Sequence, residues 1–500
     1  MQLVTLPLLL ALVPLQDGAP ADPRLRADPD LEGLPERWEG AMRALHVPGL
    51  AVAVVRDGKV SHMQTFGVRD LDAGKPVTPD TIFYIASCTK TYVALALAEL
   101  AAEGELDLEA SVKDHLPRFE LPDEDRTVMT TVEDLLCHRA GIDAFPIVFL
   151  DAYSGEITAD RYYHFLKEAQ VAGRVEYTNV NFTLAGQLLE ALTGKPWKDA
   201  LKERVFAPLG MTRTTGYADW MYAQGDVAFP TVPTPEGSDA AAVRKIDATM
   251  HAAGGLGTTI DDFARWVRFQ VGDGALDGVR LLPKEWLART HALTGELEQT
   301  EGTLRVMQGY GLAWNVGTLR GRRYCQHGGG YVGSAALVSF LPDDGLGVAV
   351  LANSDAGAQL LTALITIDVY GRLLGEELPD LLPGYLEQAS EYRAQMSAPR
   401  EASARLSAET LSLAPAAYAG TYASEWWGTL KIAVEDGALT GTLGALTLEL
   451  SPGASGGADA FHATTAAGMD WEGAFELEEG QVKWALLQMP GEREARFERE

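Results

Sequence analysis

The sequence predicts an α/β fold of the α+β type: an antiparallel sheet flanked by helices, with an inserted helical lobe and a small C-terminal antiparallel β-barrel. Three observations support this prediction. Hairpin patterns occur near the start of the chain, at 51–66, and again at 334–353. The segments between the two hairpins are mostly helical. After Pro415, short apolar segments alternate with turn residues.

The two hairpins are expected to build one sheet from both ends of a domain. The first has an apolar run at 51–55, an Asp-Gly turn and a second strand at 59–66. The second has strands at 334–340 and 346–353 around a Pro-Asp-Asp-Gly turn. Because the intervening chain is helical, we expect its helices to cover the sheet and to form a lobe beside it.

A serine and a lysine stand three residues apart at the start of a predicted helix, 87–104. Residues at this spacing share one helix face, so the amine of Lys90 can lie beside the hydroxyl of Ser87. A serine hydroxyl needs a base to become a good nucleophile, and a lysine in an apolar helix can lose its proton. The pair therefore indicates nucleophilic catalysis, although the same spacing also occurs on ordinary exposed helices.

Two further elements follow in a fixed order. The sequence Tyr177-Thr178-Asn179 precedes a second apolar helix at 182–193. A His-Gly-Gly sequence at 327–329 ends a short predicted strand at 324–326.

The order S-x-x-K, Y-x-N and [K/H]-x-G resembles the serine β-lactamase and penicillin-binding superfamily. Phrases between these motifs match as well, at 78–83, 135–142 and 253–256. The resemblance covers roughly residues 40–375 and is closest to the branch of class C β-lactamases, D-aminopeptidases, D-Ala-D-Ala carboxypeptidases and esterases. It implies an active site at the junction of the sheet and the helical lobe.

The resemblance implies a role for each residue of the first two motifs. Ser87 would attack a carbonyl carbon and form an acyl-enzyme. Lys90 would either accept the serine proton or hold Tyr177 ionised, and the sequence leaves both roles open. Tyr177 would pass a proton to the leaving group. Asn179 would bind Lys90 and the substrate amide.

The third motif departs from the usual β-lactamase pattern. His327 stands where β-lactamases usually carry a lysine that binds the substrate carboxylate. A histidine is mostly neutral at pH 7, which favours peptide or ester substrates over β-lactams. Gly328 and Gly329 let the backbone approach the substrate closely. The amide of Gly330 would pair with that of Ser87 as an oxyanion hole.

Other candidate groups are assigned structural roles. His138, in the phrase at 135–142, is expected to shape the cleft rather than to do chemistry. Cys88, Cys137 and Cys325 cannot all pair, and we expect buried thiols. The sequence contains no metal-ligand spacing and no dinucleotide fingerprint, so we predict no metal and no cofactor.

The region 414–500 predicts a second, small β-domain. Eight short segments separated by turn residues extend from 418 to 498, a pattern typical of a barrel or sandwich. Its opening Tyr-Ala-Gly-Thr-Tyr resembles the lipocalin-like domain often appended to this hydrolase branch. We expect it to assist folding rather than to bind its own ligand. A connector is predicted at 384–413, after a hydrolase domain at 30–383.

The N-terminus predicts export. Residues 3–15 are apolar and Ala19-Pro20-Ala21 offers a cleavage site, so 1–21 is predicted to be a signal peptide and the protein to be periplasmic or secreted. The apolar run is too short for a stable membrane span. The formal net charge of -29 argues against nucleic-acid binding. The oligomeric state stays open.

Together these features predict an exported serine hydrolase that acts through an acyl-enzyme on a small-molecule or peptide substrate. The substrate would be a peptide or amide, with or without a D-residue, or an ester. Two alternatives stay open: a class C-type β-lactamase, and a penicillin-binding receptor that deacylates too slowly to turn over. Selectivity would lie in loops such as 146–174 and 216–245, which carry no recognisable motif.

Overall fold

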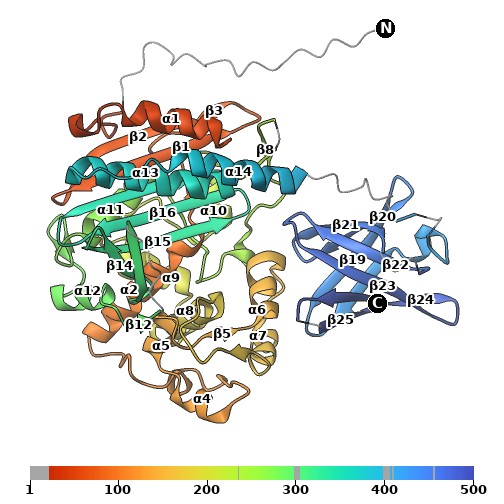
Figure 1. The fold of residues 1–500 in the computed structure, drawn as a ribbon. Helices are drawn as coiled ribbons and strands as arrows, with labels where there is room; N and C mark the ends of the chain where they lie inside the picture. Colours follow the sequence, from red (N-terminus) through yellow and green to blue (C-terminus); the bar gives the residue numbers. More distant parts are fainter. Residues whose placement is uncertain are drawn as a thin grey trace, which may run out of the picture.

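The computed structural model shows two folded parts that follow one another along the chain (Figure 1). The described residues are 22–234, 236–297, 304–397, 406–407, 410–453, 457–491 and 493–500. The predicted signal peptide and part of the predicted connector lie outside the described residues.

A nine-stranded antiparallel sheet forms the centre of the first part, in the order β12-β13-β14-β15-β16-β17-β1-β2-β3. Strand β1 (Gly49–Arg56) lies between β2 (Lys59–Asp70) and β17 (Leu346–Ala352), with Val52 opposite Val350. The pairing of β1 with β17 confirms that strands from both ends of the domain share one sheet.

The third motif lies within a strand of this sheet. The other strands are β3 (Lys75–Pro76), β12 (Gly295–Glu296), β13 (Arg305–Tyr310), β14 (Asn315–Leu319), β15 (Arg322–Tyr331) and β16 (Ser334–Leu341). The predicted strand at 324–326 ended too early, because the residues from His327 to Tyr331 also pair with β16. Strands β12 to β14 were not predicted.

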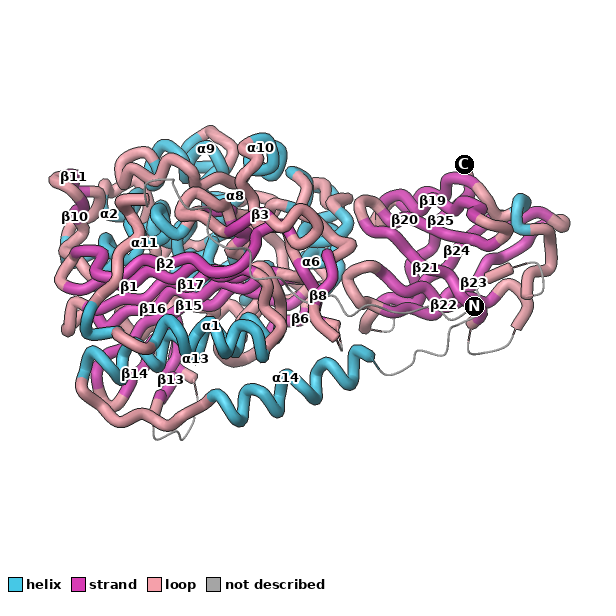
Figure 2. The backbone as a smooth tube through the Cα atoms, turned by 90° about the horizontal axis from the view of Figure 1, so that it is seen from above, coloured by secondary structure: helices cyan, strands magenta, loops and turns pink. Residues whose placement is uncertain are grey.

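Helices cover both faces of the sheet (Figure 2). On one face lie α1 (Leu34–Ala44), α13 (Ala356–Leu374) and α14 (Leu382–Ser397). On the other lie α2 (Thr89–Ala102) and α11 (Ile260–Gln270). Almost every residue of α2 is buried, as expected for an apolar helix enclosed between sheet and lobe. No helix in the described ranges combines the length and the apolar character needed to cross a membrane.

Short elements build the helical lobe and its connections. The other helices are α3 (Val112–His115), α4 (Glu124–Met129), α5 (Val132–Leu136), α6 (Phe145–Phe149), α7 (Ala159–Leu166), α8 (Asn179–Thr193), α9 (Trp197–Leu201), α10 (Ala218–Ala223) and α12 (Lys284–Thr290). Strand pairs are β4 (Phe83–Tyr84) with β9 (Gly257–Thr258), β5 (Ile142–Asp143) with β6 (Gln170–Val171), β7 (Thr231–Pro233) with β8 (Ser238–Ala240), and β10 (Ala275–Leu276) with β11 (Val279–Arg280). Within the described residues, π-helical turns occur at Leu150–Ser154 and Lys202–Phe206.

Eight strands close into an antiparallel barrel in the second part of the chain. They are β18 (Gly420–Ser424), β19 (Gly428–Glu435), β20 (Ala438–Leu443), β21 (Leu446–Pro452), β22 (Ala460–Thr465), β23 (Asp470–Glu478), β24 (Gln481–Met489) and β25 (Arg493–Arg499). The predicted C-terminal barrel is therefore confirmed. Large buried side chains such as Trp471, Phe475 and Phe497 belong to its core.

The barrel packs against the lobe at α6, α7 and the first π-helical turn (Figure 1). The ring of Phe149 meets that of Trp471 edge to face, with centroids 5.3 Å apart. The amide of Ala445 donates to the carbonyl oxygen of Ser154 at 2.8 Å. Because apolar side chains of both parts are in contact, the two share one continuous core.

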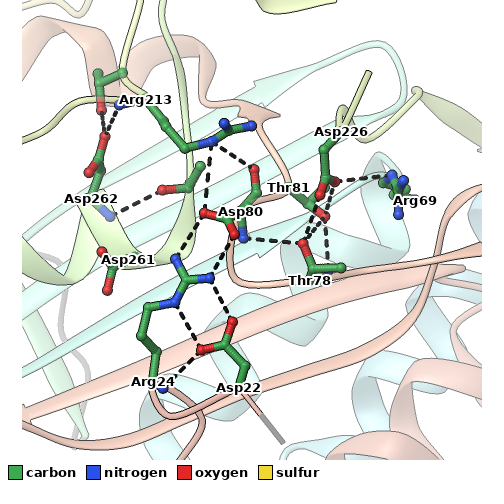
Figure 3. Close-up of polar contacts among 12 residues, drawn as sticks. Asp22, Arg24, Arg69, Thr78, Asp80, Thr81, Arg213, Asp226, Asp261 and Asp262 are labelled. Atoms are coloured by element: carbon green, nitrogen blue, oxygen red, sulfur yellow. Dashed lines mark hydrogen bonds and ion pairs between the residues drawn. The ribbon is translucent and has the colours of Figure 1, made fainter. Parts of the chain in front are cut away.

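The segment that leads into the serine motif is anchored by a polar network (Figure 3). The Arg24 guanidinium lies between the carboxylates of Asp22 and Asp80, at 2.6 and 2.7 Å. Nearby, the Thr81 hydroxyl donates to Asp226 at 2.6 Å. Because the segments at 22–24 and 226 are distant from it in the sequence, the network ties two separate segments to the phrase at 78–83.

Candidate active site

Ser87 lies in a 3-10 turn, Ala86–Cys88, that leads directly into α2. The residue before it, Ala86, has a left-handed φ of 43°, which residues other than glycine rarely adopt. Such strain is typical of functional sites, where the surrounding structure enforces it. Ser87 is partly exposed and lines a cleft, whereas its neighbours are mostly buried. The turn therefore presents the hydroxyl to the cleft.

The amine of Lys90 contacts three oxygen atoms. Its Nζ lies 3.0 Å from Ser87 Oγ, 2.8 Å from Asn179 Oδ1 and 2.7 Å from the carbonyl oxygen of Ala253. The structure thus brings three predicted residues from two separate motifs together. Ala253 belongs to the Ala-Gly-Gly-Leu phrase, and the sequence did not assign it a role.

Burial holds the pKa of the Lys90 amine well below its usual range. The side chain is 0% exposed, so its charged form loses nearly all contact with water. A neutral amine has two hydrogens and one lone pair. The oxygens of Asn179 and Ala253 can accept the two hydrogens, which leaves the lone pair facing the hydroxyl of Ser87.

Tyr177 lies just before helix α8 and lines the same cleft as Ser87. Its phenol interacts with the Ser87 side chain, and its ring centre is 4.8 Å from Lys90 Nζ. The residue is 41% exposed, yet its hydroxyl end points into the site. Burial raises the pKa of this phenol above its usual range, so Tyr177 is protonated at neutral pH.

The imidazole of His138 packs against the ring of Tyr177. The two rings are 4.7 Å apart, and His138 Nδ1 accepts a hydrogen bond from the amide of Thr178 at 3.3 Å. Burial, reinforced by the nearby Lys90, holds the pKa of His138 well below its usual range. A neutral, enclosed imidazole that packs on Tyr177 agrees with the expected role in shaping the cleft.

Strand β15 brings the third motif against the serine turn. A Cβ at Gly329 would lie 2.0 Å from the carbonyl oxygen of Ile85 and 3.3 Å from the amide nitrogen of Ser87. Glycine is therefore required there for the strand to approach so closely. A Cβ at Gly328 would meet only ordinary contacts. Gly330 follows and lines the cleft together with Ser87.

His327 is buried and neutral. Its Nδ1 lies 2.7 Å from the carbonyl oxygen of Gly328. Burial, with a smaller contribution from the nearby Lys90, lowers the pKa of His327 to about 3. The imidazole therefore adds no positive charge to the cleft at pH 7, as the sequence predicted.

The cleft in front of Ser87 has a volume of about 360 Å³. Five of its polar or aromatic lining residues were not predicted: Arg305, Tyr310, Asn315, Gln326 and Gln359. The guanidinium of Arg305 donates to Gln326 Oε1 at 3.1 Å. These residues come from three strands and from α13, and none belongs to a recognisable motif. Only the fold places them together.

The three cysteines are buried and free. Burial raises the pKa of each thiol, to about 11 for Cys137 and to about 12 for Cys325. Protonated thiols are poor nucleophiles, so a structural role is the simplest interpretation. Within the described ranges, no group of three His, Cys, Asp or Glu residues is arranged to hold a metal ion.

Comparison with protein families matches residues 35–368 to the family described as Beta-lactamase. The match covers more than half of the chain and includes all three motifs. The chain belongs to the beta-lactamase family.

Relatives within this family include penicillin-binding and hydrolytic proteins. Penicillin-binding protein 4 of Amycolatopsis lactamdurans is 28% identical over 368 residues, covering 69% of this chain and 91% of that protein. Unguisins hydrolase ungD' of Aspergillus campestris is 28% identical over 363 residues, covering 66% of this chain and 62% of that protein.

The octameric penicillin-binding protein homologue from Pyrococcus abyssi has a similar structure, with a TM-score of 0.59 and 22% sequence identity. The match covers 93% of this chain and 99% of that one. At this identity the similarity establishes a shared fold, which extends over both parts of the chain. This member of the beta-lactamase family thus combines the family's hydrolase fold with a C-terminal barrel.

Proposed function

We propose that this protein is an exported serine hydrolase that acts through an acyl-enzyme on peptide, amide or ester substrates. The observation that carries the proposal is the contact of a fully buried Lys90 amine with the Ser87 hydroxyl at 3.0 Å. A desolvated amine beside a serine at the edge of a cleft is the arrangement that activates a nucleophile. Family membership supports the same reaction class.

In the proposed first step, Lys90 acts as the base. The neutral amine accepts the Ser87 proton while Oγ attacks the carbonyl carbon, and negative charge develops on the carbonyl oxygen. The amides of Ser87 and Gly330 would stabilise this oxyanion. The raised pKa of Tyr177 argues against an ionised phenolate as the base, so the structure favours Lys90 among the two roles left open by the sequence.

In the proposed second step, Tyr177 donates a proton to the leaving group as the carbon–nitrogen or carbon–oxygen bond breaks. Its phenol interacts with the Ser87 side chain, and it can regain a proton from the Lys90 ammonium, whose nitrogen lies 4.8 Å from the ring centre. Water then attacks the acyl group, and the released Ser87 recovers its proton. No cofactor takes part in this scheme.

The cleft suggests how a substrate would be selected. His327 is neutral, so it provides no strong anchor for a carboxylate. Arg305 supplies a guanidinium to the same cleft from β13, which is a different strand from the one that carries His327. We propose that neutral groups of the substrate lie near His327 and that an acidic group, where present, pairs with Arg305.

A slowly deacylating penicillin-binding receptor is the second candidate, since one relative bears the name penicillin-binding protein. A panel of chromogenic D-aminoacyl amides, dipeptidyl amides, short-chain esters and cephalosporins separates the candidates. Turnover of amides or esters by the wild type, abolished in Ser87→Ala, supports the hydrolase. Rapid labelling by penicillin without turnover supports the receptor, and fastest turnover of cephalosporins supports a β-lactamase.

Export is part of the proposal and is tested separately. The apolar N-terminal segment at 3–15 and the following small residues motivate it. N-terminal sequencing of protein recovered outside the cytoplasm should give a mature chain that begins near residue 22. Recovery of the uncut chain in the cytoplasm alone would contradict export.

A further inference from the structure

A buried lysine lies close to both segments that carry the proposed oxyanion amides. Lys245 is 4% exposed, and its amine donates to the carbonyl oxygens of Ala152 at 2.7 Å and Thr249 at 3.3 Å. It belongs to none of the three motifs. Removing a lysine amine from water is unfavourable, so its retention here indicates that its contacts matter.

Three tyrosine rings pack around this amine, and that of Tyr153 is the most distant, with its centre 5.9 Å from Nζ. Nζ of Lys245 lies 3.8 Å from the ring centre of Tyr331 and 5.2 Å from that of Tyr84. These two rings meet edge to face with centroids 5.6 Å apart. The lysine and the rings of Tyr84 and Tyr331 therefore form one packed unit, held by van der Waals and aromatic contacts and, when the lysine is charged, by cation–π attraction as well.

Tyr84 and Tyr331 each adjoin one half of the proposed oxyanion hole. Tyr331 directly follows Gly330 at the end of β15, and Tyr84 stands three residues before Ser87. The Tyr331 hydroxyl also donates to the carbonyl oxygen of Ala152 at 3.3 Å, which is the same oxygen that accepts from the lysine. A displacement of either ring would therefore move one of the two amides.

We propose that Lys245 is a positioning residue for the oxyanion hole. By holding the rings of Tyr84 and Tyr331 together, it sets the separation between the amides of Ser87 and Gly330. This inference rests on the proposed serine hydrolase function. The lysine touches no reacting atom, and it acts through the two tyrosines.

The expected signature is a loss of transition-state binding. Oxyanion donors stabilise charge that develops only in the transition state, so their misplacement lowers kcat more than it raises KM. Burial lowers the pKa of Lys245 to about 7. Both its ammonium and its amine form can donate to the Ala152 carbonyl and pack on the Tyr331 ring, so the positioning effect does not require the charge.

The test uses the full-length variants Lys245→Met and Tyr331→Leu and their double mutant. Each is assayed with a p-nitrophenyl ester and inhibited with phenylboronic acid, which forms a tetrahedral adduct with an active serine. In each single variant, kcat should fall about 10- to 100-fold and the inhibition constant should rise by a similar factor, with KM within about twofold. The double mutant should lose little more than the worse single variant, because both changes break one unit.

The variant Lys198→Met is the matched control. Its amine donates to the carbonyl oxygen of Asp247 at 3.0 Å and lies 4.9 Å from the ring centre of Tyr217, which are contacts of the same kind away from both oxyanion segments. This variant should keep both constants within about twofold. The proposal is wrong if Lys198→Met loses as much as Lys245→Met, or if the single losses add in the double mutant.

Two further comparisons keep the test decisive. Folded Lys245→Met that retains kcat and boronate affinity overturns the positioning role, and if this variant does not fold, Tyr331→Leu decides by the same two measurements. Hydrolysis that survives in Ser87→Ala overturns the proposed function, and the positioning role with it. Hydrolysis that is lost in Ser87→Ala but intact in Lys245→Met overturns the positioning role alone.

Discussion

The hydrolase domain and the barrel are stabilised by cores of different composition. The hydrolase interior contains buried ionisable side chains, among them Lys90, Lys245 and His327. In the described part of the barrel, no lysine, arginine or histidine is buried, and the core consists mainly of aliphatic and aromatic side chains such as Trp471 and Phe475.

This difference indicates that the amines and imidazoles whose burial opposes folding lie in the hydrolase domain. Burying an amine without its water shell opposes folding, and a functional site is the place where such a cost is retained. The described part of the barrel buries no amine or imidazole, although it does bury the carboxyl group of Asp459. It packs on the lobe beside the π-helical turn that supplies the carbonyl of Ala152. We infer that all catalytic groups belong to the hydrolase domain, and that the barrel acts only by packing against the helical lobe.

The largest effect is expected for Ser87→Ala. Removing the nucleophile should lower kcat by about 10³-fold or more and abolish labelling by fluorophosphonate probes. Steady-state hydrolysis of the best substrate and gel-based labelling measure this. Retention of most of the activity would show that Ser87 is not the nucleophile. It would also contradict the assignment of the catalytic groups to this site in the hydrolase domain.

Lys90→Met should lower kcat by about 10³-fold and also change how stability depends on pH. Between the lowered pKa of Lys90 and the value of about 10.4 for an unfolded lysine, only the unfolded chain binds this proton, so the stability of the wild type rises with pH in that window. Urea denaturation between pH 6 and 9 should show a smaller slope for Lys90→Met. The control Lys431→Met, at an exposed barrel lysine, should leave the slope unchanged.

The pH dependence of activity tests which buried groups of the hydrolase domain titrate during catalysis. Activity should rise with pH through neutrality, because the coupled Lys90 and Tyr177 must hold one proton fewer than their fully protonated form. His327, with a pKa of about 3, should not contribute between pH 5 and 9. Tyr177→Phe should lower kcat by about 10²-fold and shift the apparent pKa in kcat/KM profiles. An unchanged profile would exclude the tyrosine from the titrating unit.

A smaller effect, on selectivity, is expected at the third motif. His327→Lys should raise kcat/KM for carboxylate-bearing substrates about tenfold relative to neutral esters, because it adds a cation near the substrate. Arg305→Gln should lower the same ratio by about as much. Paired assays with a neutral ester and its carboxylate analogue measure both. The interpretation of His327 fails if the wild type already hydrolyses cephalosporins faster than every ester and amide tested.

The smallest effect on catalysis is expected from the barrel. Trp471→Ala removes a buried indole that contacts Phe149, and should destabilise the protein by about 3 kcal/mol. Because none of the described barrel residues lines the cleft, kcat should change less than about threefold. Thermal denaturation and ester hydrolysis measure the two effects. A large loss of kcat in the folded variant would show that docking of the barrel controls the active site.

Features that depend on neighbours in the chain were predictable from the sequence alone. The three-residue spacing of Ser87 and Lys90 places both on one helix face whatever surrounds the helix, and Lys90 Nζ does contact Ser87 Oγ. The eight C-terminal strands were likewise marked by short apolar runs and turn residues. Motif order then indicated the family, and with it Tyr177, Asn179 and the third motif.

Features that depend on contacts between distant segments were decided by the tertiary structure. The carbonyl of Ala253, the guanidinium of Arg305 and the packing of Lys245 on two tyrosines involve residues without a local signature. The low pKa of Lys90 also belongs to this class, because an apolar helix can make burial plausible but only the packed lobe removes the water. Local geometry follows from covalent spacing and periodicity, whereas desolvation and long-range contacts exist only once the sheet, the lobe and the barrel have assembled.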